Sequence, residues 1–262
     1  MLRGLYTGWT GMINEQNRVD VLTNNMANSA TTGYKKEGTT SRAFKDVLAY
    51  KIKDTSEANI PKRLGDMNLG VMIGENYTDY SQGPIHETGN TFDLALSGKG
   101  FFAIEFTSKP KGDQPGEVSV KYTRDGSFTL NVNGELVTKD GDYVLNQAGG
   151  HIVLDPTKDF MVDRQGVIRQ GNEVVGNIQV IDFADYNYLE KYGENMYQPV
   201  EGALIQASDA AVYSGYLESS NVQVVQEMVD LITYTRAYET NQKMVQAFDE
   251  SLGKAVNDVG KV

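Results

Sequence analysis

The chain has 262 residues, a formal net charge of −11 at pH 7 and no cysteine. The absence of cysteine excludes disulfides, thiolate nucleophiles and cysteine-ligated metal sites, and no run approaches the roughly 18 apolar residues of a membrane-spanning helix. The formal charges of residues 1–36 sum to +2 and those of residues 221–262 sum to −2, so the net negative charge lies in the residues between these two segments. An acidic middle argues against nucleic-acid binding, because phosphates require a basic face.

The first thirty residues are predicted to form an amphipathic helix. Gly4, Gly8 and Gly11 share one face of it, and three interior glycines would weaken the helix by roughly 3 kcal/mol. Their common face favours the close approach of another helix, with a frayed terminus as the alternative. A second face of the helix is formed by residues spaced three or four apart. They are Leu2, Leu5, Trp9, Met12, Gln16, Val19, Thr23 and Met26.

Polar residues are predicted to end this helix and to open a connector. Asn24, Asn25 and Asn28 compete for backbone hydrogen bonds, and Gly33 is suited to a helix stop. Within a connector over residues 37–80, residues 41–52 are predicted to form a short amphipathic helix, because helical spacing relates Phe44, Val47, Leu48 and Ile52.

Residues 81–215 are predicted to form a β-rich domain. Apolar residues alternate with period two in this region, and glycine-containing turns separate the alternating runs. Such spacing is typical of antiparallel hairpins in a sandwich or barrel. The turn pairs are Asn133-Gly134, Asp140-Gly141, Gln165-Gly166 and Gln170-Gly171.

The last forty residues predict a long helix with a heptad seam. One column of the seam is apolar throughout and contains Val224, Leu231, Tyr238, Val245, Leu252 and Val259, while the other contains Met228, Thr235, Gln242 and Asp249. No Gly or Pro interrupts residues 217–252, and Ser219, Ser220 or Asn221 is expected to cap the helix, with Glu227 in its early turns. The polar seam residues either fix the register between helices or face solvent.

The expected fold class is therefore α+β. The N- and C-terminal helices are predicted to pair as a coiled-coil-like domain, residues 1–36 plus 216–262, around the inserted, mainly antiparallel β-domain of residues 81–215.

No pattern in the chain indicates catalysis. The only histidines, His86 and His151, lie in separate β-segments, so a zinc site is not expected. Residues 98–103 (GKGFFA) approach a dinucleotide fingerprint, but the sequence continues as a strand where that motif needs a helix. We expect no catalytic residue, metal or cofactor.

Five blocks resemble the bacterial flagellar rod and hook proteins. They are residues 22–35 (LTNNMANSATTGYK), 88–104 (TGNTFDLALSGKGFFAI) with Gln82-Gly83 before them, 122–128 (YTRDGSF), 193–197 (GENMY), and the segment 220–243. Together they span most of the chain. The resemblance implies a structural subunit of the flagellar rod, foremost the distal rod, in a helical tube that transmits torque from motor to hook and surrounds an export channel.

The resemblance also implies partners and an assembly interface. Partners would be copies of the chain itself, other rod and hook subunits, the export apparatus and surrounding ring proteins. Export through that apparatus agrees with the lack of a signal-peptide pattern at the N-terminus. We further expect the glycine-weakened helix to stay disordered until it meets neighbouring subunits. The candidate interface residues are Leu5, Trp9, Met12, Val19, Asn24, Asn25, Met26, Asn28, Val224, Met228, Leu231, Arg236, Tyr238, Val245 and Leu252.

Two alternatives remain at this point. The first is a proximal instead of a distal rod subunit, since both share every block quoted above. The second is a protein of another class, a cell-wall-associated β-domain enzyme or carbohydrate-binding module, which an exposed aromatic platform in the β-region would favour.

Overall fold

The computed structural model describes residues 2–50, 63–108, 118–171, 173–193 and 195–259. It is an α+β structure with a helix near each end and antiparallel strands between them. The chain divides into two compact units. The helical unit contains Met1–Ala27, Glu37–Asp79 and Gln223–Val262, and the β unit contains Asn28–Lys36 and Tyr80–Val222. Residues 37–79 thus accompany the helices; the predicted division into assembly and outer domains stays a prediction.

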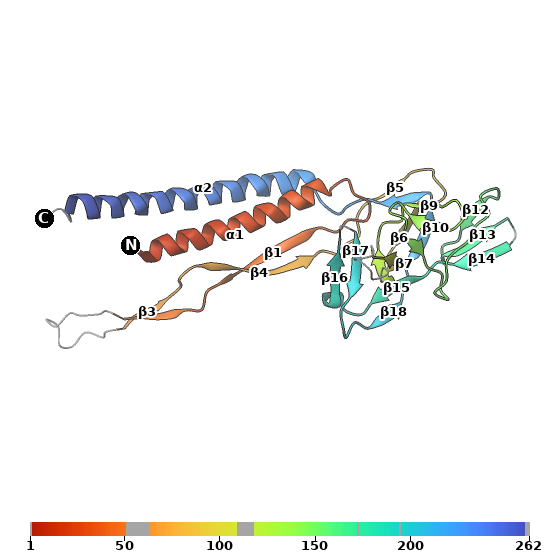
Figure 1. Ribbon diagram of the computed structural model, residues 1–262, viewed down its shortest axis with the longest axis horizontal. Helices are drawn as coiled ribbons and strands as arrows, with labels where there is room; N and C mark the ends of the chain where they lie inside the picture. The colour runs from red at the N-terminus through yellow and green to blue at the C-terminus, as the bar shows by residue number, and fades with distance from the viewer. Residues whose placement is uncertain (1, 51–62, 109–117, 172, 194, 260–262) are drawn as a thin grey trace, which may run out of the picture. The chain divides into compact units, whose positions relative to one another are not determined.

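In the helical unit, helix α1 (Leu2–Ala27) lies antiparallel to helix α2 (Val224–Lys254), which continues as a π-helical turn at Ala255–Val259 (Figure 1). The predicted close approach at the glycines is confirmed. A Cβ on Gly4 or Gly8 would meet a side chain of α2 too closely to fit without movement. Contacts along the pair join Gly4 with Phe248, Gly8 with Val245, Gly11 with Asn241, Arg18 with Tyr234, and Asn25 with Glu227.

The covered face of α2 confirms one predicted heptad column and corrects the other. Val224, Leu231, Tyr238, Val245 and Leu252 are all partly shielded from solvent, and the side chain of Val259 lies outside the described residues. The second column is wrong by one position, because Met228, Thr235, Gln242 and Asp249 are exposed and the shielded residues are Glu227, Tyr234, Asn241 and Phe248. Gly4 and Gly11 of the opposing helix leave room for Phe248 and Asn241. Glu227 and Asn241 are polar, so a search for apolar residues does not select them.

The start of α2 also differs from the prediction. Tyr216–Glu218 forms strand β20, paired with β5 (Ile85–Glu87), and the helix begins at Val224, a few residues later than a cap at Ser219, Ser220 or Asn221 would place it. Its N-cap is Gln223, which makes no side-chain cap hydrogen bond. The predicted caps bond elsewhere: Ser219 to His86, Ser220 to Val222, and Asn221 to Lys36 and Ser81.

The predicted short helix over residues 41–52 is wrong. This region forms strand β1 (Glu37–Ala43), which pairs with β4 (Val71–Thr78), and β2 (Val47–Tyr50), which pairs with β3 (Arg63–Met67); Ile52 lies outside the described residues. A helix this short is marginal by itself, whereas the strand gains a ladder and a helix to pack on. Ser41 of β1, for example, donates a hydrogen bond to Asn14 of α1.

All strand pairs among the described residues of the β unit are antiparallel. Its main sheet has the order β16 (Leu189–Tyr192), β17 (Met196–Pro199), β8 (Val118–Thr123), β7 (Phe101–Thr107), β11 (Tyr143–Val144), β10 (Leu136–Thr138) and β9 (Phe128–Leu130). Strand β15 (Val180–Phe183) joins β7 and carries β18 (Ile205–Ala207) on its other side.

Smaller sheets complete this unit. One contains β12 (Phe160–Val162), β13 (Val167–Gln170) and β14 (Glu173–Asn177), and a second pairs β6 (Leu94–Ser97) with β19 (Ala211–Ser214). A 3-10 turn at Tyr186–Tyr188 follows β15. The largest core cluster includes Leu96, Phe102, Ile104, Leu136 and Ile168, so β6, β7, β10 and β13 supply the apolar layer that holds the sheets together.

Candidate functional site

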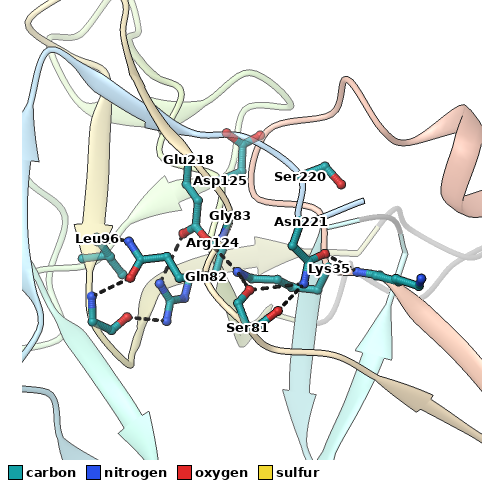
Figure 2. A network of polar contacts seen from close by, with 12 residues as sticks. Lys35, Ser81, Gln82, Gly83, Leu96, Arg124, Asp125, Glu218, Ser220 and Asn221 are labelled. Atoms are coloured by element: carbon teal, nitrogen blue, oxygen red, sulfur yellow. Dashed lines mark hydrogen bonds and ion pairs between the residues drawn. The ribbon is translucent and has the colours of Figure 1, made fainter. Parts of the chain in front are cut away.

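Three charged side chains meet in the interior of the β unit and form what we call the ion cluster: Lys35, Arg124 and Glu218 (Figure 2). Lys35 follows the turn after α1, Arg124 lies between β8 and β9, and Glu218 ends β20. Each side chain is at most 3% exposed. Segments far apart in sequence are therefore joined at one point.

Glu218 is the acceptor at the centre of the ion cluster. Its Oε1 accepts hydrogen bonds from Lys35 Nζ at 2.6 Å and from the backbone N–H of Gly83 at 2.9 Å. Its Oε2 accepts from Arg124 Nη1 at 3.2 Å. Three donors thus converge on one carboxylate, and charge-assisted bonds of this kind are about twice as strong as neutral ones.

The two cations also bind backbone carbonyl groups around the ion cluster. Lys35 Nζ donates to the carbonyl of Ser81 at 2.7 Å, and Arg124 Nη2 donates to the carbonyl of Gly98 at 2.8 Å. The guanidinium lies over the ring of Phe101, 5.3 Å from its centroid, which adds a cation–π contact. Each cation therefore fixes the loop that it reaches.

A glycine at the cluster permits the approach of the segments. Gly33 has φ +67°, and a Cβ there would overlap the peptide that joins Arg124 to Asp125, so both its conformation and its space require glycine. Beside it, Thr32 donates to Asp125 at 2.7 Å. The backbone N–H of Lys36 donates to the Asn221 side chain at 2.7 Å.

This geometry suits a structural role better than a catalytic one. A substrate has no access to side chains that are closed to solvent, and every Glu218 oxygen already accepts a hydrogen bond. Removing one partner of such a buried group leaves an uncompensated charge. The ion cluster thus holds together five segments of the β unit, which contain Lys35, Ser81 and Gly83, Gly98, Arg124, and Glu218.

A second polar group of the β unit surrounds Asp182. This carboxylate accepts hydrogen bonds from the Tyr186 hydroxyl at 2.7 Å and from the Gln206 amide at 2.9 Å. Burial by itself would raise the pKa of Asp182, but these hydrogen bonds outweigh it and hold the pKa below its ordinary value. Burial, reinforced by the bond to Asp182, raises the pKa of Tyr186. The pair is therefore an ionised carboxylate with a protonated phenol.

The structure distributes the predicted interface residues over several environments. Trp9, Asn24, Met228 and Arg236 are exposed, whereas Asn25 is buried and bonds Glu37 and Glu227. The remaining residues are partly shielded, namely Leu5, Met12, Val19, Met26, Asn28, Val224, Leu231, Tyr238, Val245 and Leu252.

The ion cluster was not found from the sequence, although all of its members lie inside or beside the quoted blocks. Lys35 ends the block at residues 22–35, and Arg124 lies in the block at 122–128. Glu218 stands two residues before the last block. A charged residue inside such a block gave no sign of burial, because charged side chains are mostly exposed. Within the described ranges, no group of three or more His, Asp or Glu residues could hold a metal ion, and no helix is long and apolar enough to cross a membrane.

Comparison with known proteins finds three matching families. Residues 5–35 match the family described as "Flagella basal body rod protein", and residues 95–181 match "Flagellar hook protein FlgE/F/G D1 domain". Residues 213–258 match "Flagellar basal body rod FlgEFG protein C-terminal". The matches include both helices and much of the β unit.

Whole-chain relatives agree with these matches. The flagellar basal-body rod protein FlgF of Caulobacter vibrioides is 34% identical over 100% of both chains. The flagellar basal-body rod protein FlgG of Bacillus subtilis is 36% identical over 98% of this chain and 99% of its own. The flagellar hook-basal body complex protein FlhO of the same species is 31% identical over 100% of both chains.

Proposed function

The chain belongs to the flagellar basal-body rod proteins, and from this premise we propose that it assembles into the rod through the outward faces of its two helices. It is a structural subunit of the rod, located in the flagellar basal body. The observation that carries the proposal is the placement of large apolar side chains on the solvent side of α1 and α2.

On α2 an apolar stripe faces away from α1. Val225 is 78% exposed and Ile232 is 54% exposed, and Met228 and Val229 are exposed between them. Their spacing of three and four residues makes a continuous row on one helix face. On α1 a similar row contains Tyr6, Trp9 and Ile13. Contiguous exposed apolar rows of this kind indicate contact surfaces.

The two rows lie toward opposite ends of the antiparallel pair, since one follows the start of α1 and the other follows the start of α2. Different surfaces on one molecule make heterologous contacts, and such contacts give open helical filaments when the rotation does not close. We therefore place copies of the chain in a helical tube. From the relationship to the rod proteins we further propose that this tube transmits torque from motor to hook and surrounds the export channel.

We also propose that α1 and α2 form a coiled-coil-like pair before assembly. The shielded residues of α2 follow heptad spacing, and α1 already has a helical partner in its own chain. Disorder of α1 in the monomer is the competing expectation. Limited proteolysis of the purified monomer separates the two: an intact chain supports pairing, and rapid loss of both ends to leave a core near residues 40–215 supports disorder.

Substitution on the α2 stripe tests the assembly proposal. Ile232→Asp should abolish sedimentable polymer while the circular dichroism of the monomer is unchanged, because the new carboxylate would be buried between subunits. Thr240→Asp, at an exposed polar position of the same helix, is the matched control. Trp9, the single tryptophan of the chain, reports the contact, and its emission should shift to the blue on assembly. Normal polymer from Ile232→Asp would overturn the proposal.

The position along the rod is proposed as distal, with the proximal rod as the alternative, and gold labelling along purified basal bodies distinguishes them. Other rod and hook subunits are its proposed neighbours, with the export apparatus and surrounding rings as further partners. We propose no enzymatic activity, since the charged groups gathered at the ion cluster are closed to substrate.

A further inference from the structure

The β unit contains a groove of about 300 Å³ to which the rod function assigns no role. Two extended runs, residues 177–181 and 205–208, supply most of its lining. Aliphatic side chains such as Ile178 and Ile205 are combined with amides such as Gln147 and Asn177. None of the lining residues is charged or aromatic.

This chemistry limits the ligand. A groove without a charged lining residue does not select a phosphate, a nucleotide or an acidic peptide, which require paired charges. Without an aromatic ring it offers no stacking surface to a flat ligand. Primary amides combined with aliphatic side chains suit a polypeptide segment that has an apolar side chain and free backbone groups. The ligand class is therefore an uncharged peptide segment.

Charge also favours a second copy of this chain as the source of that segment. The net charge is −11, so two copies repel each other over most of their surfaces. The groove is lined almost wholly by uncharged stretches of sequence, in which repulsion is least. These stretches are residues 143–154, 174–181, 202–208 and 210–217.

The β unit carries a matching projection at the turn between β9 and β10. Val132 is 105% exposed, more than any other large apolar residue described. Asn131 makes this turn rigid, because its Oδ1 accepts hydrogen bonds from the N–H groups of Asn133 and Glu135, both at 2.9 Å. The turn ends the uncharged stretch of residues 126–134. The rigid turn thus holds the apolar side chain of Val132 exposed to solvent.

We propose that the Val132 turn of one copy occupies the amide-lined groove of the next copy in the polymer. The projection and the groove are different surfaces of the same unit, so the contact is heterologous and repeats without closing. The Val132 side chain contacts the aliphatic residues of the groove, and the groove amides form hydrogen bonds with the exposed backbone of the turn. This inference rests on the proposed assembly and adds to it a second interface, made by the β unit.

Cysteine cross-linking tests the contact directly, because the chain has no cysteine of its own. Full-length Val132→Cys and Ala207→Cys variants are mixed, allowed to polymerise and oxidised. Both positions are exposed, and Ala207 lines the groove. We expect a disulfide between peptides containing positions 132 and 207, formed roughly tenfold or more faster than in the control. The control mixture replaces Val132→Cys by Val118→Cys, at another exposed valine of the β unit.

The outcomes separate this inference from the proposed function. Sedimentable polymer in which 132 and 207 link no faster than 118 and 207 overturns the groove contact and leaves assembly through the helices intact. Absence of polymer from unmodified chain overturns both. Val132→Asp should slow polymer growth, whereas Val118→Asp should not, and equal growth rates of these two variants would also overturn the groove contact.

Discussion

Replacing Glu218 by glutamine gives the sharpest test of the ion cluster. The substitution keeps the size of the side chain and removes only its charge and one acceptor oxygen. Lys35 Nζ, the Gly83 N–H and Arg124 Nη1 all donate to this carboxylate. In Glu218→Gln the new NH₂ group must face at least one of these donors, so that a buried donor loses its acceptor.

The expected loss is large relative to the stability of a domain. Breaking a buried ion pair by removing one partner costs about 3–5 kcal/mol, and both cations here lose their shared counter-charge. Whole domains are stable by only about 5–15 kcal/mol. We therefore expect Glu218→Gln to lower the free energy of unfolding of the β unit by about 3 kcal/mol or more.

Urea unfolding, followed by tyrosine near-ultraviolet circular dichroism and by hydrogen exchange, measures this loss. The amide of Gly83 should exchange faster, because it donates to Glu218. Glu173→Gln is the matched control: its carboxylate lies 3.7 Å from Lys158 with side chains 81% and 52% exposed, so its loss should stay within about 1 kcal/mol. If the two variants unfold at the same urea concentration, the cluster does not hold the β unit together.

Three further substitutions have effects on stability whose sign the structure predicts. Gly253→Ala should stabilise α2 by up to about 1 kcal/mol, since no atom lies within 4 Å of the added Cβ. Gly8→Ala should lose that gain because its Cβ would lie 3.0 Å from Val245; equal rises in melting temperature would contradict this. For Asp182, a depressed folded pKa means that its stabilisation is present above the ordinary pKa of 3.8 and is lost as the pH falls through the folded value. Asp182→Asn should remove this acid-dependent part, and parallel stability curves of the two proteins below about pH 4 would refute it.

The sequence was sufficient to predict the type of those elements whose residue pattern has a strong periodicity. Alternation of period two and glycine turns predicted the antiparallel strands, and the long heptad predicted α2. It failed at residues 41–52, where the apolar spacing is compatible with a helix but the chain forms the end of strand β1 and then strand β2, which contains Val47 and Leu48. Short segments carry too little periodicity to decide, and the outcome was decided by the pairing of β1 with β4 and of β2 with β3, which come later in the chain.

The ion cluster shows another limit. The blocks at residues 22–35 and 122–128 were visible as patterns, but the pattern does not say that Lys35 and Arg124 are buried against Glu218. Burial of charge depends on a partner from another segment. Such a partner is known only when the fold brings β20 beside the loop that precedes β5.

The error in the heptad phase has a physical cause that bears on assembly. In an ordinary amphipathic helix the bulky apolar residues mark the covered face. Helix α1 reverses this order where it meets α2: glycines lie on the covered face at Gly4, Gly8 and Gly11, and Trp9 is 51% exposed. A search for apolar spacing therefore also selects exposed residues such as Trp9 and Met228. This arrangement is informative. A helix whose glycines face a partner inside the subunit has its large side chains free to contact other subunits. The same inversion in an uncharacterised chain should indicate a helix that is covered on both sides only after assembly.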